Sequence, residues 1–492
     1  MNTHYEILLP ILFPILIGAY LVADKRLNKT KALRIITTVA LVLNFAFVLL
    51  CIFEGGKELF LWNLSAGLRI NFRVDDTGRF FSALVAAMFT LVGFFSYEYI
   101  KHEDKENQFL GFYLITYGTL IGIDFAGNLI TMYLFFELMT VLSLPLVVHS
   151  RTKESIAAGI KYLIYSLFGA FMGLLGIFFL SRYTISMEFV TGGILNAYMV
   201  EGNETLLRVL ALLMIMGFGT KAGMFPLHGW LPTAHPVAPA PASAILSGVI
   251  TKAGVIAIIR VVFFIFGADF IRGTWVQYTW LALAVTTVVM GSMMAYKEKV
   301  FKKRLAYSTV SQVSYILFGL ATLTDVGFTG AMMHVVFHSV IKNTLFLVAG
   351  AVIYKTHITE VDGLRGMGKR MPVTMWMFTI ASLGLVGIPP LSGFVSKWYL
   401  ATGAIDSGAA LFSWFGPVAL LVSAVLTAGY LISVSINGFL PGKDYVVGEK
   451  CEPNLLMTVP MAVMTVLTVY FGIAPNVMVN FIQNIVSVIF KG

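Results

Sequence analysis

The chain has 492 residues, of which 58% are hydrophobic and only 12% are charged, and its mean hydropathy is +0.85. Soluble globular domains carry about 25% charged residues, so this composition excludes a soluble protein and predicts a membrane protein. The net charge of +9 would suit a nucleic-acid-binding protein, but the basic residues are concentrated in alternate loops between apolar segments, which argues against that class.

An all-α, polytopic membrane protein is predicted because apolar runs recur along the whole chain. A membrane-spanning helix needs about 20 apolar residues, and fourteen segments meet this requirement. They lie near residues 6–22, 32–53, 78–100, 109–125, 127–148, 159–181, 206–224, 240–266, 277–296, 304–321, 328–354, 374–403, 412–438 and 455–475. Residues 477–490 form a shorter amphipathic tail, which we expect to lie along the membrane surface.

Most lysine and arginine residues fall in every second loop between these segments. The positive-inside rule places such loops in the cytoplasm. We therefore expect a multi-pass protein in the cytoplasmic membrane of a bacterium or archaeon, with both termini outside. The loop residues concerned are Lys25, Arg26, Lys29, Lys31, Arg34, Arg151, Lys153, Lys297, Lys299, Lys302, Lys303, Arg304, Lys355, Arg365, Lys369 and Arg370.

In chain order, the first ionisable residue at membrane depth is Glu137, in the middle of segment 127–148. It lies too far from either end to be a capping carboxylate, and we expect it to hold or neutralise a lysine charge. Lys161 lies near the cytoplasmic start of segment 159–181. There it either extends its amine to the membrane surface or takes part in proton uptake.

Lys221 and Lys252 lie deep in segments 206–224 and 240–266. A charged side chain at the centre of a bilayer costs roughly 2.5–3.5 kcal/mol on the lenient insertion scale, so each lysine needs a partner or water. Burial disfavours the charged amine, so both lysines are candidate proton carriers. Glu137 is the candidate ion-pair partner of Lys221.

Five prolines between Pro226 and Pro241 interrupt the chain between these two lysines. An interrupted helix is tolerated at membrane depth where its backbone is buried in protein or lines a cavity. His228 and His235 lie in this break, where each is either a proton-uptake residue or an interfacial side chain.

His334, His338 and Lys342 follow one another at a spacing of four residues, which places them on one helix face. Two histidines at this spacing can bind zinc, but the two cysteines, Cys51 and Cys451, are predicted on opposite sides of the membrane and no second helix supplies ligands. We therefore expect no metal and no redox cofactor. A proton relay suits histidine, which titrates near physiological pH; the alternative is a set of interhelical hydrogen bonds.

Lys397 follows a second proline-broken segment, Gly387-IPPLSGFVSKWYL, toward its outer half. The two breaks indicate a weak internal repeat, in which the run from Gly159 matches the run from Gly330. Each unit contains five spans, residues 109–266 and 277–438, and an odd number of spans turns the second unit upside down. Residues 1–108 and 439–492 flank the repeats. Chance similarity between apolar helices is the alternative.

The motifs resemble a known family, the antiporter-like subunits shared by Mrp-type Na⁺/H⁺ antiporters, membrane-bound hydrogenases and respiratory complex I. The resemblance covers about residues 70–440. It is carried by Lys221-AGMFPLHGWLPTAHPVAPAPASAILSGVITKAG, Phe136-ELMT, Arg304-LAYSTVSQVSYILFGL, His334-VVFHSVIKNTLFLVAG and Gly387-IPPLSGFVSKWYL. It implies fourteen helices, two inverted five-helix repeats and interruptions in the seventh and twelfth helices. The lysine at 397 is similar to the D-type Mrp, the hydrogenase and the N-type complex I subunits.

The resemblance also implies roles for the ionisable residues. Glu137, Lys221 and Lys252 correspond to the carboxylate and lysines of helices five, seven and eight. His334, His338 and Lys342 correspond to the relay of helix eleven, and Lys397 to the ion of helix twelve. The second repeat has no counterpart to Glu137, since Ser311, Gln312 and Ser314 are the polar candidates there.

We therefore expect a proton- or sodium-translocating subunit of a multisubunit membrane complex. Its partners would be other membrane subunits, including homologous antiporter-like and small subunits, and its driving force would be redox chemistry in a partner or an opposing cation gradient. Protons would enter near His228 and Lys252, pass Lys342, His338 and His334, and leave beyond Lys397. The alternatives are a stand-alone secondary transporter of a small solute and a purely structural membrane anchor.

Overall fold

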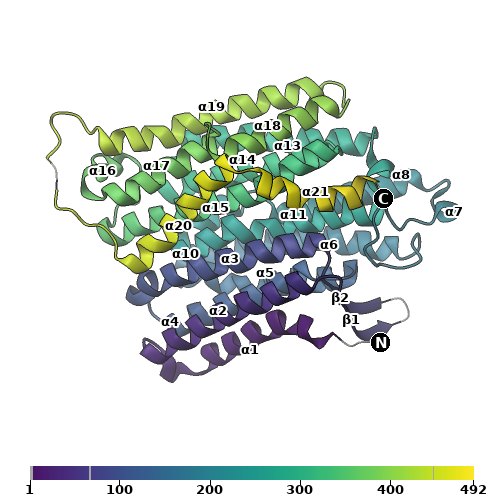
Figure 1. The fold of residues 1–492 in the computed structure, drawn as a ribbon, viewed down its shortest axis with the longest axis horizontal. Coiled ribbons are helices and arrows are strands. Elements are labelled where there is room, and N and C mark those ends of the chain that lie inside the picture. The colour runs from purple at the N-terminus through teal and green to yellow at the C-terminus, as the bar shows by residue number, and fades with distance from the viewer. Residues whose placement is uncertain (1–3, 66–67, 447, 492) are drawn as a thin grey trace.

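The computed structural model describes residues 4–65, 68–446 and 448–491. Its long helices run side by side along one common direction, with α1 at one edge of the bundle and α19 at the other (Figure 1). Within the described residues, ten helices are long and apolar enough to cross a membrane. The prediction of an all-α polytopic membrane protein is confirmed.

The first part of the chain forms three membrane helices and a hairpin that was not predicted from the sequence. The hairpin pairs β1 with β2 in antiparallel register, Glu58 opposite Arg73. It rests on the start of α5, where the Asn71 amide donates to Thr131 Oγ1 at 3.1 Å. The elements are η1 (Tyr5–Leu8), α1 (Leu9–Ala23), η2 (Lys25–Leu27), α2 (Lys31–Glu54), β1 (Glu58–Ser65), β2 (Leu68–Arg73), α3 (Asp76–Tyr99) and η3 (Ile100–His102).

The next part contains the first interrupted helix. Helix α8 ends at Lys221, and the short helix α9 resumes after a loop. The segment that carries Lys252 is one continuous helical rod with two π-helical stretches, and it is buried along its length. The elements are α4 (Glu106–Asp124), α5 (Leu129–Val147), α6 (Lys153–Leu180), α7 (Ala197–Val200), α8 (Glu204–Lys221), α9 (Leu231–Val237), α10 (Ala240–Ile245), η4 (Leu246–Ile250), α11 (Thr251–Ile259) and η5 (Arg260–Phe266).

The following part contains the second interruption, between α17 and α18. Gly387 ends α17 with φ +90°, a conformation that glycine adopts without strain. The elements are α12 (Ala268–Ile271), α13 (Trp275–Lys297), α14 (Phe301–Ala321), α15 (Asp325–Thr356), η6 (Asp362–Leu364), α16 (Met367–Arg370), α17 (Pro372–Val386), α18 (Ser392–Asp406) and α19 (Phe412–Phe439). The interruptions expected in the seventh and twelfth helices are both present.

The carboxyl-terminal region forms two helices, and the second of them contains the tail predicted from the sequence. Helices α20 (Leu455–Ile473) and α21 (Asn476–Lys491) follow each other across the bundle (Figure 1). The apolar face of α21 packs against α3 and α15, and its Phe490 ring lies 5.7 Å from that of Phe263. Helix α21 continues from the point where α20 ends, beside the break between α17 and α18, where Gly472 contacts Pro390.

Polar side chains fix where several of these apolar helices begin. Each accepts a hydrogen bond from a backbone amide of the first turn, which would otherwise lack a partner. Because such amides have no water to bond within the membrane, these caps mark the ends of the spans. The capping residues are Thr30, Asp75, Asn128, Thr152, Thr324 and Asn454.

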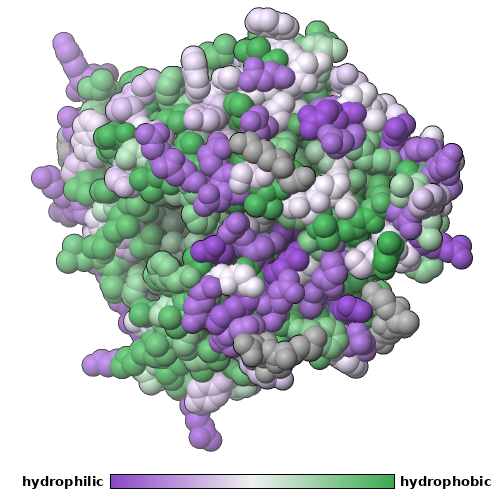
Figure 2. All heavy atoms as spheres, turned by 45° about the vertical axis from the view of Figure 1, so that its right-hand side comes forward, coloured by the Kyte–Doolittle hydropathy of each residue, from purple (hydrophilic) through white to green (hydrophobic). Residues whose placement is uncertain are grey.

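The basic loops gather at one end of the bundle, which we call the basic end (the loops around residues 24–31, 102–106, 149–153, 298–301 and 357–371). Contacts between these loops include the ion pair of Lys29 with Asp104 at 3.6 Å and the bond from Arg151 to Gln108 at 2.7 Å. Both chain termini lie at the opposite end with β1 and β2 (Figure 1), which we call the hairpin end. Figure 2 shows hydrophilic residues gathered over part of the molecule and apolar residues over much of the remaining surface.

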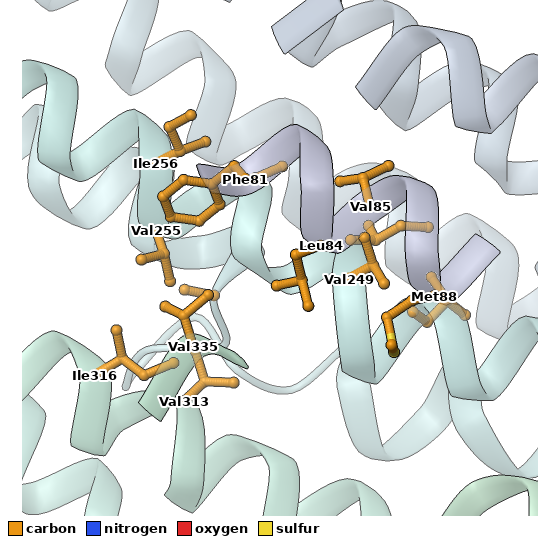
Figure 3. Close-up of a cluster of buried hydrophobic side chains, with 14 of the residues drawn as sticks. Phe81, Leu84, Val85, Met88, Val249, Val255, Ile256, Val313, Ile316 and Val335 are labelled. Atoms are coloured by element: carbon orange, nitrogen blue, oxygen red, sulfur yellow. The ribbon is translucent and has the colours of Figure 1, made fainter. Parts of the chain in front are cut away.

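The centre of the bundle is packed with apolar side chains. Figure 3 shows side chains from α3, the 240–266 rod, α14 and α15 pointing toward one another, among them Phe81, Val249, Val313 and Val335. Polar groups carried by the same helices are thus shielded from lipid, where an unpaired polar group would be costly.

Helices α6 and α8 approach closely through two glycines, and this contact should be sensitive to a single methyl group. A Cβ added at Gly169 would lie 2.5 Å from the carbonyl oxygen of Gly217. We expect Gly169→Ala to lower the free energy of unfolding by about 1–3 kcal/mol, because backbone must move to admit the methyl group. Thermal unfolding in detergent measures this, and Gly173→Ala is the control, because the nearest neighbour of its Cβ would be the Phe218 ring, at 3.0 Å. Equal stability of the two variants would contradict the prediction.

Candidate functional site

Lys221 ends α8 in a cage of hydroxyl groups. Its side chain is 1% exposed, and Nζ donates to Tyr162 Oη at 2.8 Å, Thr140 Oγ1 at 2.9 Å and Ser166 Oγ at 3.0 Å. The amine also lies 4.4 Å from the centre of the Tyr162 ring, where a cation is attracted to the aromatic face. These contacts satisfy all three donors of an ammonium group, so the buried charge needs no carboxylate beside it.

Glu137 does not form the expected ion pair with Lys221. It lies one turn from Thr140 on α5, but its side chain is half-buried and Oε1 is buried without a hydrogen-bond partner among the described residues. On α5, Thr140 therefore makes the direct contact with the Lys221 amine. Glu137 lies near the cage without a hydrogen bond to this amine.

Lys252 and His338 form the central contact of the second half. Lys252 lies 2% exposed on α11, and its Nζ is 2.7 Å from His338 Nδ1 on α15. The same amine donates to the carbonyl oxygen of Ser247 at 2.8 Å. An amine and an imidazole in direct contact can exchange a proton without an intermediate.

From His338 the titratable groups continue toward the hairpin end. The ring of His334 lies 6.0 Å from that of His338, and its Nδ1 is 2.9 Å from Ser396 Oγ on α18. Lys397, one residue further, donates to the carbonyl oxygens of Leu385 and Val386 at 2.7 and 2.9 Å, at the end of α17. The broken helix therefore supplies the acceptors that hold this amine.

Tyr315 on α14 links these groups from the side. Its ring stacks on His334 with centroids 5.5 Å apart, and the Lys397 amine lies 5.0 Å from its centre. Its hydroxyl donates to the carbonyl oxygen of Leu420 at 2.8 Å. The ring thus spans the distance between the histidine and the lysine.

Toward the basic end the groups continue through Lys342 to His235. Lys342 is fully buried, and its Nζ donates to Ser308 Oγ and to the carbonyl oxygen of Leu305. The Phe346 ring lies 5.9 Å from this amine and stacks on His235 with centroids 4.7 Å apart. Of the two histidines in the first break, the structure therefore brings His235 next to the α15 residues.

His228 and Lys161 do not contact the α15 residues described above. His228 stacks on Phe225 at 5.9 Å in the loop after α8. The Lys161 amine lies 5.9 Å from the ring of Tyr165, whose hydroxyl reaches the neighbouring Gly229. Within the described part of the chain, no hydrogen bond joins either residue to the Lys221 cage.

We call the row Lys342, Lys252, His338, His334 and Lys397 the α15 line. All five members were predicted from the sequence, but the hydroxyl groups that surround this line and the Lys221 cage were missed. Tyr162 and Ser166 stand four residues apart in an apolar helix, the same spacing that singled out the two histidines, and this signal could have found them. The partners missed are Thr140, Ser143, Tyr162, Ser166, Ser308, Tyr315 and Ser396.

Within residues 4–65, 68–446 and 448–491, no group of three or more His, Cys, Asp or Glu side chains is placed to hold an ion. The α15 line instead combines amines, imidazoles and hydroxyls, whose shared chemistry is proton exchange.

Residues 126–427 match the family described as NADH:quinone oxidoreductase/Mrp antiporter, TM. The match covers more than half of the chain. The chain belongs to this family. The motifs that carried the resemblance fall inside the matched residues and include both broken helices, so the predicted family is confirmed.

Relatives come from all three groups expected of an antiporter-like protein. NADH-quinone oxidoreductase subunit N of Desulforudis audaxviator is 35% identical over 69% of this chain and 66% of its own length. The D-type member of the Na⁺/H⁺ antiporter of Alkalihalophilus pseudofirmus is 28% identical over 94% of this chain and 93% of its own. Hydrogenase-4 component B of Escherichia coli is 30% identical, and the chain spans only 54% of it.

Two solved structures share the fold. A chain of the Mrp complex from Dietzia sp. DQ12-45-1b superposes with a TM-score of 0.87 and 21% identity, over 99% of this chain and 98% of that chain. A chain of the membrane-bound sulfane sulfur reductase, an archaeal respiratory membrane complex, gives a TM-score of 0.84 and 23% identity, over 98% and 97%. Both are chains of multisubunit membrane assemblies.

Proposed function

We propose that this antiporter-like subunit moves protons along the α15 line as part of a multisubunit membrane complex. The observation that carries the proposal is the direct contact of Lys252 with His338, continued at one side by His334 and Lys397 and at the other by Lys342. A membrane anchor does not require five titratable groups in one row, four of them buried and Lys397 half-buried. Hydrophobic residues would pack there at lower cost.

The proposal favours protons over sodium for this row. Sodium, like other hard cations, binds oxygen ligands such as carboxylates and carbonyls. The groups of the α15 line that point at one another are nitrogens, which lose and gain protons. Sodium transport by the Na⁺/H⁺ antiporter relatives would then be coupled elsewhere in their complexes.

Water is the expected carrier between neighbouring groups of the line. Nε2 of His334, Nε2 of His338 and both amide atoms of Gln312 are buried and have no partner within the described residues. Buried polar atoms are almost always hydrogen-bonded, and ordered water supplies the bond where protein does not. Gln312 and Ser314 on α14 thus provide a polar wall along which water can lie.

The Lys221 cage is proposed as the corresponding group of the first repeat. Tyr162 and Ser166 reach Lys221 from α6, as His334 and Ser396 lie beside Lys397 at α15 and α18. In each half, a lysine at a broken helix lies beside a long helix that precedes it in the chain, α6 for Lys221 and α15 for Lys397. This similarity supports two inverted units, residues 109–266 and 277–438, with residues 1–108 and 439–492 flanking them. Glu137, Lys161 and His228 would serve the first unit, with Glu137 acting on Lys221 through charge across the cage.

The basic end is proposed to face the cytoplasm, with both termini outside, as the positive-inside rule predicts. The partners are proposed to be other membrane subunits, as in the assemblies that share the fold. Driving force would come from redox chemistry in a partner or from an opposing cation gradient.

Replacing His338 with asparagine tests the proposal. Asparagine can still accept a hydrogen bond from Lys252 but cannot be protonated, so proton movement by the assembled complex in proteoliposomes should fall roughly 10²-fold. The control is His357→Asn, at an exposed position with φ +59° that asparagine tolerates. Proton movement that survives His338→Asn would overturn the proposal, and uptake of a solute by the isolated chain would favour a stand-alone transporter.

A further inference from the structure

A cavity of about 200 Å³ opens at the basic end between α3, α9 and α14. Its walls include Tyr99, Glu103, Pro236, Val300, Lys302 and Ile353. From the sequence, Lys302 counted among the topological loop lysines, and the α15 line does not use it. The cavity therefore places two charged side chains, Glu103 and Lys302, where solvent meets the end of a broken helix.

Lys302 is unlike the other loop lysines because it is buried. Its side chain is 6% exposed, and Nζ donates to the carbonyl oxygens of Pro236, at 3.2 Å, and Ala238. These carbonyls lie at the end of α9, where they have no helical partner. The Lys302 amine thus provides hydrogen bonds to the free carbonyl groups at the end of α9, beside the cavity.

Glu103 lines the same cavity. Burial raises the pKa of this carboxyl, the Lys302 charge opposes the rise, and the neighbouring Asp104 adds to it. The remaining titratable group on the walls is the Tyr99 hydroxyl. Glu103 can therefore bind and release protons closer to neutral pH than an exposed glutamate.

His235, on α9, is one residue from Pro236, whose carbonyl oxygen accepts a hydrogen bond from Lys302. It is fully buried, and neither ring nitrogen is hydrogen-bonded to any of the described residues. Its ring stacks on Phe346, the same ring that lies beside the Lys342 amine. A buried imidazole with both nitrogens free can accept a proton on one nitrogen and release one from the other.

We infer that this cavity is the mouth of the α15 line at the basic end, with Glu103 and Lys302 supplying protons and His235 passing them to Lys342. The inference rests on the proposed function. The step is balanced: Glu103 gives its proton, through water, to one nitrogen of His235 and takes another from the solvent. The imidazolium then gives the proton on its other nitrogen to the neutral amine of Lys342. The imidazole is then neutral again, and the ammonium of Lys342 carries the charge.

A thiol placed in the cavity tests the mouth directly. In a chain with Cys51 and Cys451 replaced by serine, Val237→Cys puts a thiol on the cavity wall. A membrane-impermeant, positively charged methanethiosulfonate should react with it from the basic end only and should slow proton movement by the complex. Dithiothreitol should restore the rate. Lys299→Cys, exposed at the same end but outside the cavity, should react without changing the rate.

The outcomes separate this inference from the proposed function. If the Val237→Cys thiol fails to react, or reacts without slowing transport, the inference that this cavity admits protons to the α15 line is wrong. In that case, loss of transport on replacing Lys252 would still support proton movement along the α15 line. Transport that survives the Lys252 replacement would contradict the proposed function itself.

Two further variants keep the test independent of the thiol. His235→Asn should lower proton movement roughly 10²-fold, because asparagine cannot relay a proton. Glu103→Gln should leave the rate of proton movement unchanged at acidic pH on the cavity side. At alkaline pH it should lower the rate, because the supply of protons to the cavity then limits transport. Equal loss at both pH values would indicate a structural role and would overturn the assignment of Glu103.

Discussion

Replacing Lys252 with methionine should abolish proton movement by the assembled complex. The amine is the group that meets His338 at 2.7 Å, and methionine keeps much of its length without any proton to give. A positioned acid–base group typically contributes 10²–10⁴-fold to a proton transfer, so we expect a loss of roughly 10²-fold or more. The measurement is the initial rate of pH change inside proteoliposomes.

The amount and stability of the complex should remain near those of the unsubstituted protein. Replacing a buried charge with an apolar side chain of similar volume is often neutral or stabilising, and this separates lost transport from lost assembly. Lys297→Met, at an exposed position at the end of α13, is the matched control and should leave the rate unchanged. An assembled Lys252→Met complex with full transport would contradict the relay.

The positions of the α15 line could be predicted because membrane depth makes ionisable residues conspicuous. A lysine in the middle of an otherwise apolar run has no inexpensive structural explanation, and a spacing of four residues fixes a shared helix face. Segment 240–266 and the line His334, His338 and Lys342 follow from these two arguments alone.

What could not be predicted depends on how the helices are rotated against one another. Glu137 and Thr140 are three residues apart on α5, and the sequence offered the carboxylate as the partner of Lys221. The rotation of α5 turns Thr140 toward the amine instead, and α6 supplies the other hydroxyls. Because spacing along one helix says nothing about the neighbouring helix, such a contact is visible only in the fold.

Lys302 and residues 477–490 show the same limit at the ends of segments. Lys302 stands in a cluster of basic loop residues, and only the carbonyls at the end of α9 reveal why it is buried. The tail is too short to span, and only the fold shows that it packs against α3 and α15 after α20 ends beside Pro390. The hairpin of β1 and β2 was likewise hidden, since a short strand pair gives a weak signal beside long apolar helices.

A large loss of stability is expected at the hairpin end when the ion pair of Asp75 with Arg260 is broken. The guanidinium is 1% exposed and donates two bonds to the carboxylate, at 2.6 and 2.7 Å, between the rings of Phe189 and Phe264. Asp75→Asn keeps the cap of α3, where Asp75 accepts from the Gly78 amide, but leaves the buried guanidinium without its counter-charge. Removing one partner of a buried pair costs about 3–5 kcal/mol, and we expect the lower figure because the carboxylate is partly exposed.

The midpoint of thermal unfolding in detergent measures this loss, with Asp76→Asn as the neighbouring control. Asp76 is 40% exposed and pairs with Arg79 one turn away, so its replacement should cost less than about 1 kcal/mol. Equal loss in the two variants would show that the Arg260 pair contributes nothing beyond a surface pair.

The pH dependence of that loss identifies the carboxylate as its source. Burial alone would raise the pKa of Asp75, but the charge and hydrogen bonds of Arg260, with the Gly78 amide, hold it below its usual range. A lowered pKa in the folded state stabilises the protein above the pKa of the unfolded chain, about 3.9. The stability difference between the unsubstituted protein and Asp75→Asn should therefore be complete at neutral pH and shrink as pH falls below about 4. A difference that stays constant through this range would mean that shape, and not charge, holds α3 to the 240–266 rod.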